Sequence, residues 1–230
     1  MEKTSPLVIT ISRQLGSGGA YVGQELAKHL NIYYADREII GQAAKKLSVL
    51  EEDLDSRDEK ISSFWQSYFE SFESLAFITS FSAPHEHEHM PYHIFPPTDR
   101  ELFNIQTKII EHIARERSAV IVGRCGHHIL CEHPNHVSIF LHGDITFRKG
   151  RIQKLFNISE EVAGKMIIQS DKERAHYNHT FTGREWTDAR QYDISINTSK
   201  IGVDDSVELI LQYLESSLRN PVHKRPAGEN

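Results

Sequence analysis

The residues whose types and spacing most clearly suggest chemistry are three glycines near the start of the chain, Gly16, Gly18 and Gly19. They follow a short apolar run, residues 7–11, and they precede apolar residues that recur at helical spacing. This order predicts a strand, a tight turn and a helix. Glycines in such a turn let backbone N–H groups converge on phosphate oxygens at the positive end of the helix. The pattern therefore predicts an anion-binding site in the turn.

The turn departs from the usual phosphate-binding motif, G-x-x-x-x-G-K-[ST]. The apolar face of the following helix must contact the sheet, which places Gly18 and Gly19 on the usual Gly-Lys pair and Arg13 on the first glycine. The lysine that would reach the β- and γ-phosphates is therefore missing, and Ala20 replaces the hydroxyl residue that would bind magnesium. The alternative is a tight turn whose glycines only let strand and helix approach each other. The candidate ATP- and phosphate-binding residues are Arg13, Gly16, Ser17, Gly18 and Gly19.

A series of arginines in the second half of the chain is also suited to phosphate chemistry. Phosphoryl transfer is catalysed mainly by positioning and by cationic groups around the transferring phosphoryl group. Arg148 and Arg151 are three residues apart after a predicted strand, so one helix face can present both. Arg174, Arg184 and Arg190 follow them. The alternative for any single arginine is a solvated helix face. The candidate catalytic residues are Arg148, Arg151, Arg174 and Arg184.

Polar residues also follow two other predicted strands. Asp36-Arg37 and Gly123-Arg124 each lie just beyond the carboxyl end of a strand, where open α/β sheets bind ligands. Asp36 is suited to accept a hydrogen bond from an acceptor molecule or to hold magnesium through water, and the alternative is that it caps a helix. The candidate acceptor-binding residues are Asp36, Arg37 and Arg124.

Two groups of histidines raise the question of a metal site. The first group falls in a proline-rich stretch that indicates a solvated loop; its members are His85, His87, His89 and His93. The second group lacks the C-x-x-C and H-x-x-x-H pairs of structural zinc sites; its members are Cys125, His127, His128, Cys131, His133 and His136. We expect residues 125–131 to form a turn and a short helix, and we assign no residue to a metal.

Strands and helices alternate along the chain, which predicts a mainly parallel sheet with helices on both faces. The expected strands span residues 7–11, 32–34, 118–122, 136–141 and 193–196. An aromatic-rich helix is expected at residues 61–82 and a closing helix at residues 203–218. Asp144 and Ser159 are expected to cap two helices between the last strands.

Further segments match one known family in sequence order. These segments are residues 11–14 with 16–19, residues 34–40, residues 120–125, residues 171–174 with Tyr177, and residues 192–199. Together they resemble the cytidylate-kinase-like family. The resemblance implies a three-layer α/β P-loop kinase fold with a five-stranded parallel sheet, an NMP-binding insertion and a mobile lid. It implies a single domain over residues 1–220, with the insertion at about 48–98 and the lid at about 148–190, followed by a C-terminal tail at 221–230.

The same resemblance implies an ATP-dependent phosphotransferase. Such an enzyme uses Mg2+ with ATP and moves the γ-phosphoryl group to CMP, dCMP or a related small acceptor. The family typically shares the lysine-poor loop. Arg124 matches a position that contacts the acceptor nucleotide, whereas Cys125 stands where an acidic residue is usual. Two other classes remain open: a non-catalytic nucleotide-binding regulatory module with a degenerate P-loop and, on histidine counts alone, a metal-binding protein.

The composition limits the partners. The chain has 230 residues, 39% of them hydrophobic and 25% charged, as is ordinary for a soluble globular protein. A net charge of −6 disfavours a general nucleic-acid binder, which must neutralise phosphates. The apolar runs are far shorter than the roughly 18 residues of a membrane span, no secretory signal is visible, and two cysteines cannot build a disulfide framework. We therefore expect a cytoplasmic protein whose partners are ATP and a nucleoside monophosphate or similar small acceptor, without nucleic acid or membrane.

Overall fold

The computed structural model of the chain describes residues 5–36, 39–40 and 100–219. The chain divides into two compact units, residues 1–43 with 106–230 and residues 44–105. The first unit holds the whole sheet. The predicted insertion, the aromatic-rich helix and the first histidine group lie outside the described residues.

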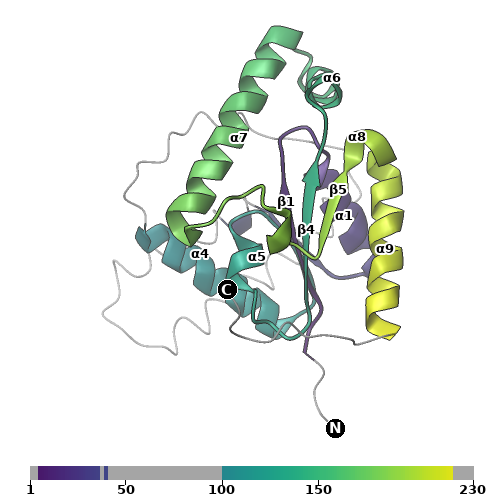
Figure 1. The fold of residues 1–230 in the computed structure, drawn as a ribbon. Helices are drawn as coiled ribbons and strands as arrows, with labels where there is room; N and C mark the ends of the chain where they lie inside the picture. The colour runs from purple at the N-terminus through teal and green to yellow at the C-terminus, as the bar shows by residue number, and fades with distance from the viewer. Residues whose placement is uncertain (1–4, 37–38, 41–99, 220–230) are drawn as a thin grey trace. The chain divides into compact units, whose positions relative to one another are not determined.

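A five-stranded parallel sheet forms the centre of the first unit, and this confirms the prediction (Figure 1). Its strands are β1 (Val8–Arg13), β2 (Tyr33–Ala35), β3 (Ala119–Val122), β4 (His136–His142) and β5 (Ile194–Asn197). Their order is β2-β3-β1-β4-β5, and every neighbouring pair is parallel. β1 lies in the middle of the sheet, and its first five residues are all buried, as expected for a strand covered on both faces. The carboxyl ends of all five strands therefore meet at one edge of the sheet.

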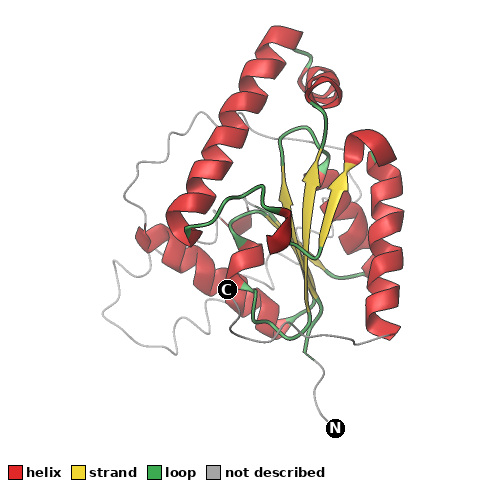
Figure 2. Cartoon of the chain, in the orientation of Figure 1, coloured by secondary structure: helices red, strands yellow, loops and turns green. Residues whose placement is uncertain are grey.

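Helices lie on both sides of the sheet (Figure 2). They are α1 (Gly19–Leu30), α4 (Arg100–Glu116), α5 (Gly126–Ile129), α6 (Ile145–Phe156), α7 (Glu160–Thr182), α8 (Thr198–Ile201) and α9 (Val203–Arg219), with a short 3-10 turn, η1 (Ala189–Gln191). Among the helices of the described ranges, none is long and apolar enough to cross a membrane. The short helix α5 occurs where residues 125–131 predicted one, and α6 with α7 occupies most of the stretch predicted as a lid.

Alternation along β1 decides which helix meets which face of the sheet. Ile9 and Ile11 belong to an apolar cluster that includes residues of α1 and α9. Thr10 points the opposite way, because a Cβ built on Gly126 at the start of α5 would lie 3.2 Å from its methyl carbon. The two faces of one strand thus position α1 with its glycine-rich turn on one side and α5 on the other.

The two predicted helix caps behave differently. The Ser159 hydroxyl accepts a hydrogen bond from the Val162 amide at 3.3 Å, which confirms the cap of α7. Asp144 occupies the cap position of α6, but its side chain makes no capping hydrogen bond. Its carboxylate lies instead 3.4 Å from the Lys200 ammonium group. The Asp144 prediction is therefore right in position and wrong in the side-chain bond.

The close approach of α1 to β3 depends on Gly23. A Cβ at this position would lie 2.8 Å from a methyl carbon of Val122 and 3.1 Å from the Tyr34 ring. We expect Gly23→Ala to lower the free energy of unfolding by about 1–3 kcal/mol through overpacking. The matched control is Gly150→Ala in α6, where a Cβ would meet no atom within 4 Å. This control should be neutral or stabilising by up to about 1 kcal/mol, because alanine favours the helix. Urea unfolding measures both, and equal effects would contradict the close packing.

Candidate active site

The turn between β1 and α1 has a shape that only glycine adopts easily. Gly16 and Gly18 have φ values of 82° and 86°, in the left-handed region that side chains disfavour. Space is short as well: a Cβ on Gly16 would lie 2.8 Å from the Arg148 carbonyl oxygen, and one on Gly18 would lie 2.6 Å from a methyl carbon of Val203. Backbone conformation and packing both require these two glycines.

Several amides of this turn have no partner within the described parts of the chain. The amides of Gln14 and Leu15 donate to the Leu141 carbonyl and to the Asp171 carboxylate, each at 2.9 Å. Within the described ranges no hydrogen-bond acceptor is found for a second set of amides, those of Gly16, Gly18, Gly19, Ala20 and Tyr21. These amides lie at the N-terminus of α1, where the helix dipole favours a negative charge. The arrangement is suited to bind a phosphate group.

Ser17 faces inward. Its side chain is fully buried, and its hydroxyl lies 2.8 Å from the Gln14 carbonyl oxygen and 3.1 Å from the Leu141 carbonyl oxygen. The Ser17 amide also bonds within the turn, to the Gln14 carbonyl. The hydroxyl therefore fastens the turn to the end of β4, and of the predicted phosphate-binding residues Ser17 is the one turned into the protein.

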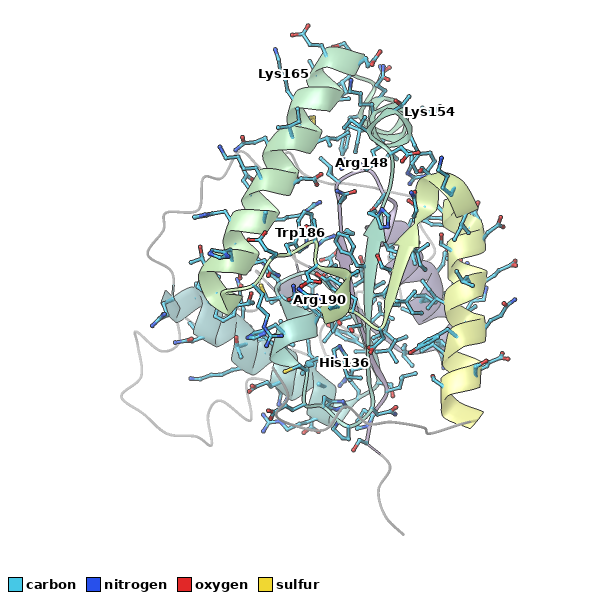
Figure 3. The ribbon with its side chains drawn as sticks, viewed as in Figure 1. His136, Arg148, Lys154, Lys165, Trp186 and Arg190 are labelled. Atoms are coloured by element: carbon cyan, nitrogen blue, oxygen red, sulfur yellow. The ribbon has the colours of Figure 1, made fainter. Side chains whose placement is uncertain are left out.

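An ion pair between buried Arg148 and half-buried Asp171 connects the turn to the lid stretch. Arg148 on α6 is 7% exposed, and its guanidinium donates to Asp171 on α7 at 2.5 Å and to the Leu15 carbonyl at 3.3 Å. The other carboxylate oxygen of Asp171 accepts from the Leu15 amide. Arg174 donates to the Arg13 carbonyl at 3.2 Å. Figure 3 labels Arg148 near the turn that follows β1. We call the group formed by Arg148, Asp171 and the Leu15 backbone the loop clasp.

Apolar packing accompanies the loop clasp. The Leu15 side chain is buried in a small cluster with Ile152 of α6 and with Ala163 and Ile167 of α7. The turn thus contributes one side chain to the core of the helical hairpin that the sequence predicts as a lid. Polar and apolar contacts join the same three elements.

The remaining predicted arginines lie in different places. Arg151 has a buried Nε with no hydrogen-bond partner within the described ranges. Arg151 lies near Tyr21 in the first turn of α1, because its positive charge acts on the Tyr21 hydroxyl. The hydrogen bond from Tyr21 to Asp204 raises the pKa of Tyr21, and the charge of Arg151 opposes this increase. Arg184 lies near α5, because its charge lowers the pKa of His128 in addition to the larger effect of burial.

Arg190 is placed differently from these arginines. Its side chain is 90% exposed and forms an ion pair with Asp188 at 2.7 Å. The structure thus brings Arg148 and Arg174 to the glycine-rich turn and places Arg151 beside α1. Arg184 and Arg190 lie elsewhere on the lid stretch.

The predicted acceptor residues follow β2 and β3, which are neighbours in the sheet. Gly123, Arg124 and Cys125 all have positive φ, at 86°, 55° and 55°, a run that costs energy for the two residues with side chains. The Arg124 guanidinium lies 5.5 Å from the centre of the Tyr177 ring. Arg37 lies outside the described residues.

Asp36 makes the contacts of a helix cap. One carboxylate oxygen accepts from the Ile39 amide at 3.1 Å, and the other lies 3.4 Å from the Tyr34 hydroxyl. The capping alternative for Asp36 is therefore realised in the geometry. A cap uses one oxygen and does not exclude a ligand on the other.

The second histidine group does not gather around one point. His127 lies 3.3 Å from the Ser12 hydroxyl, His136 lies 2.7 Å from the Thr10 hydroxyl, and His133 contacts the Ala114 carbonyl oxygen at 3.2 Å. In the part of the chain that the structure describes, no three histidine, cysteine or acidic side chains come together as metal ligands.

Asp171 is the site residue that sequence reasoning did not assign, although it lies in one of the family-like segments. Its spacing to Arg174 places both on one face of α7, which is a signal that they act together. The partners of Asp171 on the turn are 156 residues away in sequence. That contact has no local pattern from which it could be predicted.

Three comparisons with known proteins bear on the site. The model of the cytidylate kinase-like family matches residues 8–200. A cytidylate kinase from Saccharolobus islandicus is 33% identical over 119 residues, which cover 51% of this chain and 61% of that protein. The chain thus spans less than two thirds of the length of this relative. A cytidylate kinase from Sulfurisphaera tokodaii is 26% identical over 220 residues, 94% of this chain and 100% of that protein.

A solved structure has the same fold. An uncharacterized protein from Eubacterium ventriosum superposes with a TM-score of 0.66 and 26% identity, over 92% of this chain and 99% of that one.

The loop clasp predicts a specific loss of stability. Asp171→Asn removes the charge that compensates the buried Arg148, so we expect the free energy of unfolding to fall by about 2–4 kcal/mol. The matched control is Glu161→Gln. Glu161 forms a 2.7 Å ion pair with Lys165, but both side chains are more than 70% exposed, and exposed pairs contribute little. Urea unfolding compares the two variants. If the control costs as much as Asp171→Asn, the loop clasp does not stabilise the fold.

Buried His127 predicts a pH dependence. Burial, and then the neighbouring His128 and His136, lower its pKa to about 4 from an ordinary value of 6.5. The unfolded chain therefore binds more protons between these values, and stability falls as the pH drops from 6.5 toward 4. We expect this one group to contribute about 3 kcal/mol of that loss. His127→Gln should flatten the dependence in unfolding measured at several pH values. His176→Gln, on the exposed face of α7, controls for the substitution itself, and an unchanged dependence in His127→Gln would contradict the assignment.

Proposed function

Because the chain belongs to the cytidylate kinase-like family and has its P-loop kinase fold, we propose that it is a kinase for CMP, dCMP or a related small acceptor, with ATP as the phosphoryl donor. The observation that carries this proposal is the glycine-rich turn. It presents amides without acceptors in the described ranges at a helix N-terminus, and arginines of the lid stretch hold it in place. Such a turn suits the phosphates of a nucleoside triphosphate.

The donor phosphates would bind the amides of Gly16, Gly18 and Gly19. A phosphate oxygen of the acceptor would attack the γ-phosphorus, and the bond from that phosphorus to the bridging oxygen would break and leave ADP. Little covalent chemistry falls to the protein, so positioning and positive charge decide the rate. We propose that Arg148 and Arg174 act mainly by fixing the backbone of the turn. Arg151 and Arg184 would meet the charge of the phosphates when the lid stretch closes.

The acceptor would lie beyond β2 and β3. Since these strands are neighbours and parallel, their carboxyl ends bring Asp36 and Arg124 to the same edge of the sheet as the glycine-rich turn. Arg124 would pair with the acceptor's phosphate, because a guanidinium matches the geometry of phosphate oxygens. An acceptor that carries a negative charge is therefore favoured over a neutral one.

Magnesium would arrive with ATP. Ala20 has no oxygen to offer at the usual hydroxyl position, and both oxygens of Asp171 are engaged in the loop clasp. The described residues of the turn therefore do not fit a direct magnesium site. Mg2+ commonly keeps several waters and binds substrate phosphates through few protein ligands. When bound, it would neutralise charge on the phosphates, and Asp36 would contact it only through water.

The absent lysine and hydroxyl favour one other function, a nucleotide-binding module without turnover. A panel of nucleoside mono-, di- and triphosphates with magnesium separates the two, because any ligand that binds the folded state raises the melting temperature. Stabilising acceptors would then enter an assay that couples ADP release to a signal. ADP release that requires an acceptor supports the kinase. Stabilisation by nucleotides without turnover for any acceptor would identify the module instead.

Arg151 provides a direct test of the lid stretch. If its guanidinium meets the transferring phosphoryl group, Arg151→Ala should lower kcat on the order of a hundredfold with little change in KM, as for contacts made chiefly in the transition state. Arg151→Lys should recover part of the rate, since it keeps the charge but loses the planar fork. Lys154→Ala removes a charge from an exposed position of the same helix and is the control (Figure 3). Turnover of Arg151→Ala within a few-fold of the parent would remove Arg151 from the mechanism.

A further inference from the structure

We propose that Arg13 supplies the positive charge that a lysine at position 19 supplies in the usual phosphate-binding motif. This inference rests on the proposed function, because it concerns how the same turn binds the β- and γ-phosphates. The motif has glycine at its first position and lysine directly after its last glycine. In this chain the first position is Arg13 and the position of the lysine is Gly19. The small residue and the cation have exchanged places.

The stem of Arg13 lies where a side chain at position 19 would start. A Cβ built on Gly19 would lie 2.7 Å from the Arg13 Cβ and 3.2 Å from its Cδ, and it would overlap the Cγ between them. No residue with a side chain fits at position 19 while Arg13 keeps this position. The two residues compete for one space, and glycine at position 19 leaves that space to the arginine.

The guanidinium lies further along the same edge of the sheet, against Gly123. A Cβ on Gly123 would overlap Nη1 of Arg13 and would lie 3.3 Å from its Cζ. β1 and β3 are neighbours in the sheet, and Arg13 is the last residue of β1 while Gly123 directly follows β3. Two glycines from different elements, Gly19 and Gly123, make room for one side chain.

The backbone of Arg13 is also fixed. Its carbonyl accepts the hydrogen bond from Arg174, and the next two amides bond to the Leu141 carbonyl and to Asp171. The side chain therefore starts from a held position beside Gly19, the first residue of α1. A guanidinium can contact two phosphate oxygens at once, and it stays protonated in any binding site. The turn thus retains the cation that phosphoryl transfer needs, supplied from the opposite end of the motif.

The test is a reciprocal exchange. Arg13→Gly should weaken ATP and ADP binding tenfold or more and lower kcat on the order of a hundredfold, with AMP binding little affected because AMP lacks the β- and γ-phosphates. Gly19→Lys alone should bind ATP poorly, because its side chain meets the Arg13 stem. The double variant recreates G-x-x-x-x-G-K and should bind ATP at least tenfold better than either single variant. Such non-additivity is the expected mark of two residues that share one space.

Two further variants separate charge from packing. Arg13→Gln keeps much of the stem over Gly19 and loses the charge, so it should fold like the parent and bind ATP as poorly as Arg13→Gly. Lys28→Gln removes one charge from an exposed position near the other end of α1 and should leave ATP binding unchanged. Circular dichroism and melting without nucleotide establish that each variant is folded.

ATP affinity, measured by calorimetry, decides the outcome independently of turnover. Parent-like ATP affinity in Arg13→Gln, or no gain in the double variant over Arg13→Gly, would overturn the proposal. If the parent binds ATP but phosphorylates no acceptor, the proposed kinase activity fails, while the ATP affinities of the variants at positions 13 and 19 still decide the role of Arg13.

Discussion

The ion pair between Arg148 and Asp171 is the contact on which the geometry of the site depends. Moving two charges out of water is costly, and a buried pair compensates only when its remaining hydrogen-bonding groups also find partners. Here most of them do, because the Leu15 amide donates to Asp171 and the Leu15 carbonyl accepts from Arg148. The buried Nε of Arg148 has no hydrogen-bond partner within the described residues. Both polar groups of one backbone residue are thus satisfied by the two members of the pair. The loop clasp therefore holds the turn in one conformation and joins it to α6 and α7.

This connection has consequences for motion as well as for shape. Leu15 shares a buried apolar cluster with Ile152 and Ile167, so the α6–α7 hairpin cannot move as a unit without displacing the turn or opening that cluster. Amides held in place before a ligand arrives need no reorganisation when charge develops on it, which is the main source of electrostatic catalysis. A lid movement in this protein would therefore take place beyond the loop clasp, in the segment after α7 that carries Arg184.

The sequence predicts the elements well and their mutual contacts poorly. The apolar run of β1, the glycines before α1 and the Ser159 cap are local patterns, and the structure confirms each of them. The inward orientation of Ser17 and the contact of Asp171 depend on residues more than a hundred positions away. No local periodicity encodes such pairs. Asp36 is a further example. From the sequence alone, a carboxylate just after a strand could equally cap a helix or bind a ligand, and only the position of the Ile39 amide shows the capping contact.

The strained turn after β3 lies beside the Arg13 guanidinium. Arg124 and Cys125 adopt positive φ, at a cost of order 1–3 kcal/mol each, directly after the glycine against which the Arg13 guanidinium lies. A side chain at position 123 would displace the Arg13 guanidinium, so this position of the turn requires glycine. The proposed exchange of glycine and cation in the turn after β1 therefore also requires a glycine directly after β3. A phosphate site requires a positive charge at a particular place in space. In the proposed site that charge is the Arg13 guanidinium, and Gly19 and Gly123 leave the space that its side chain occupies.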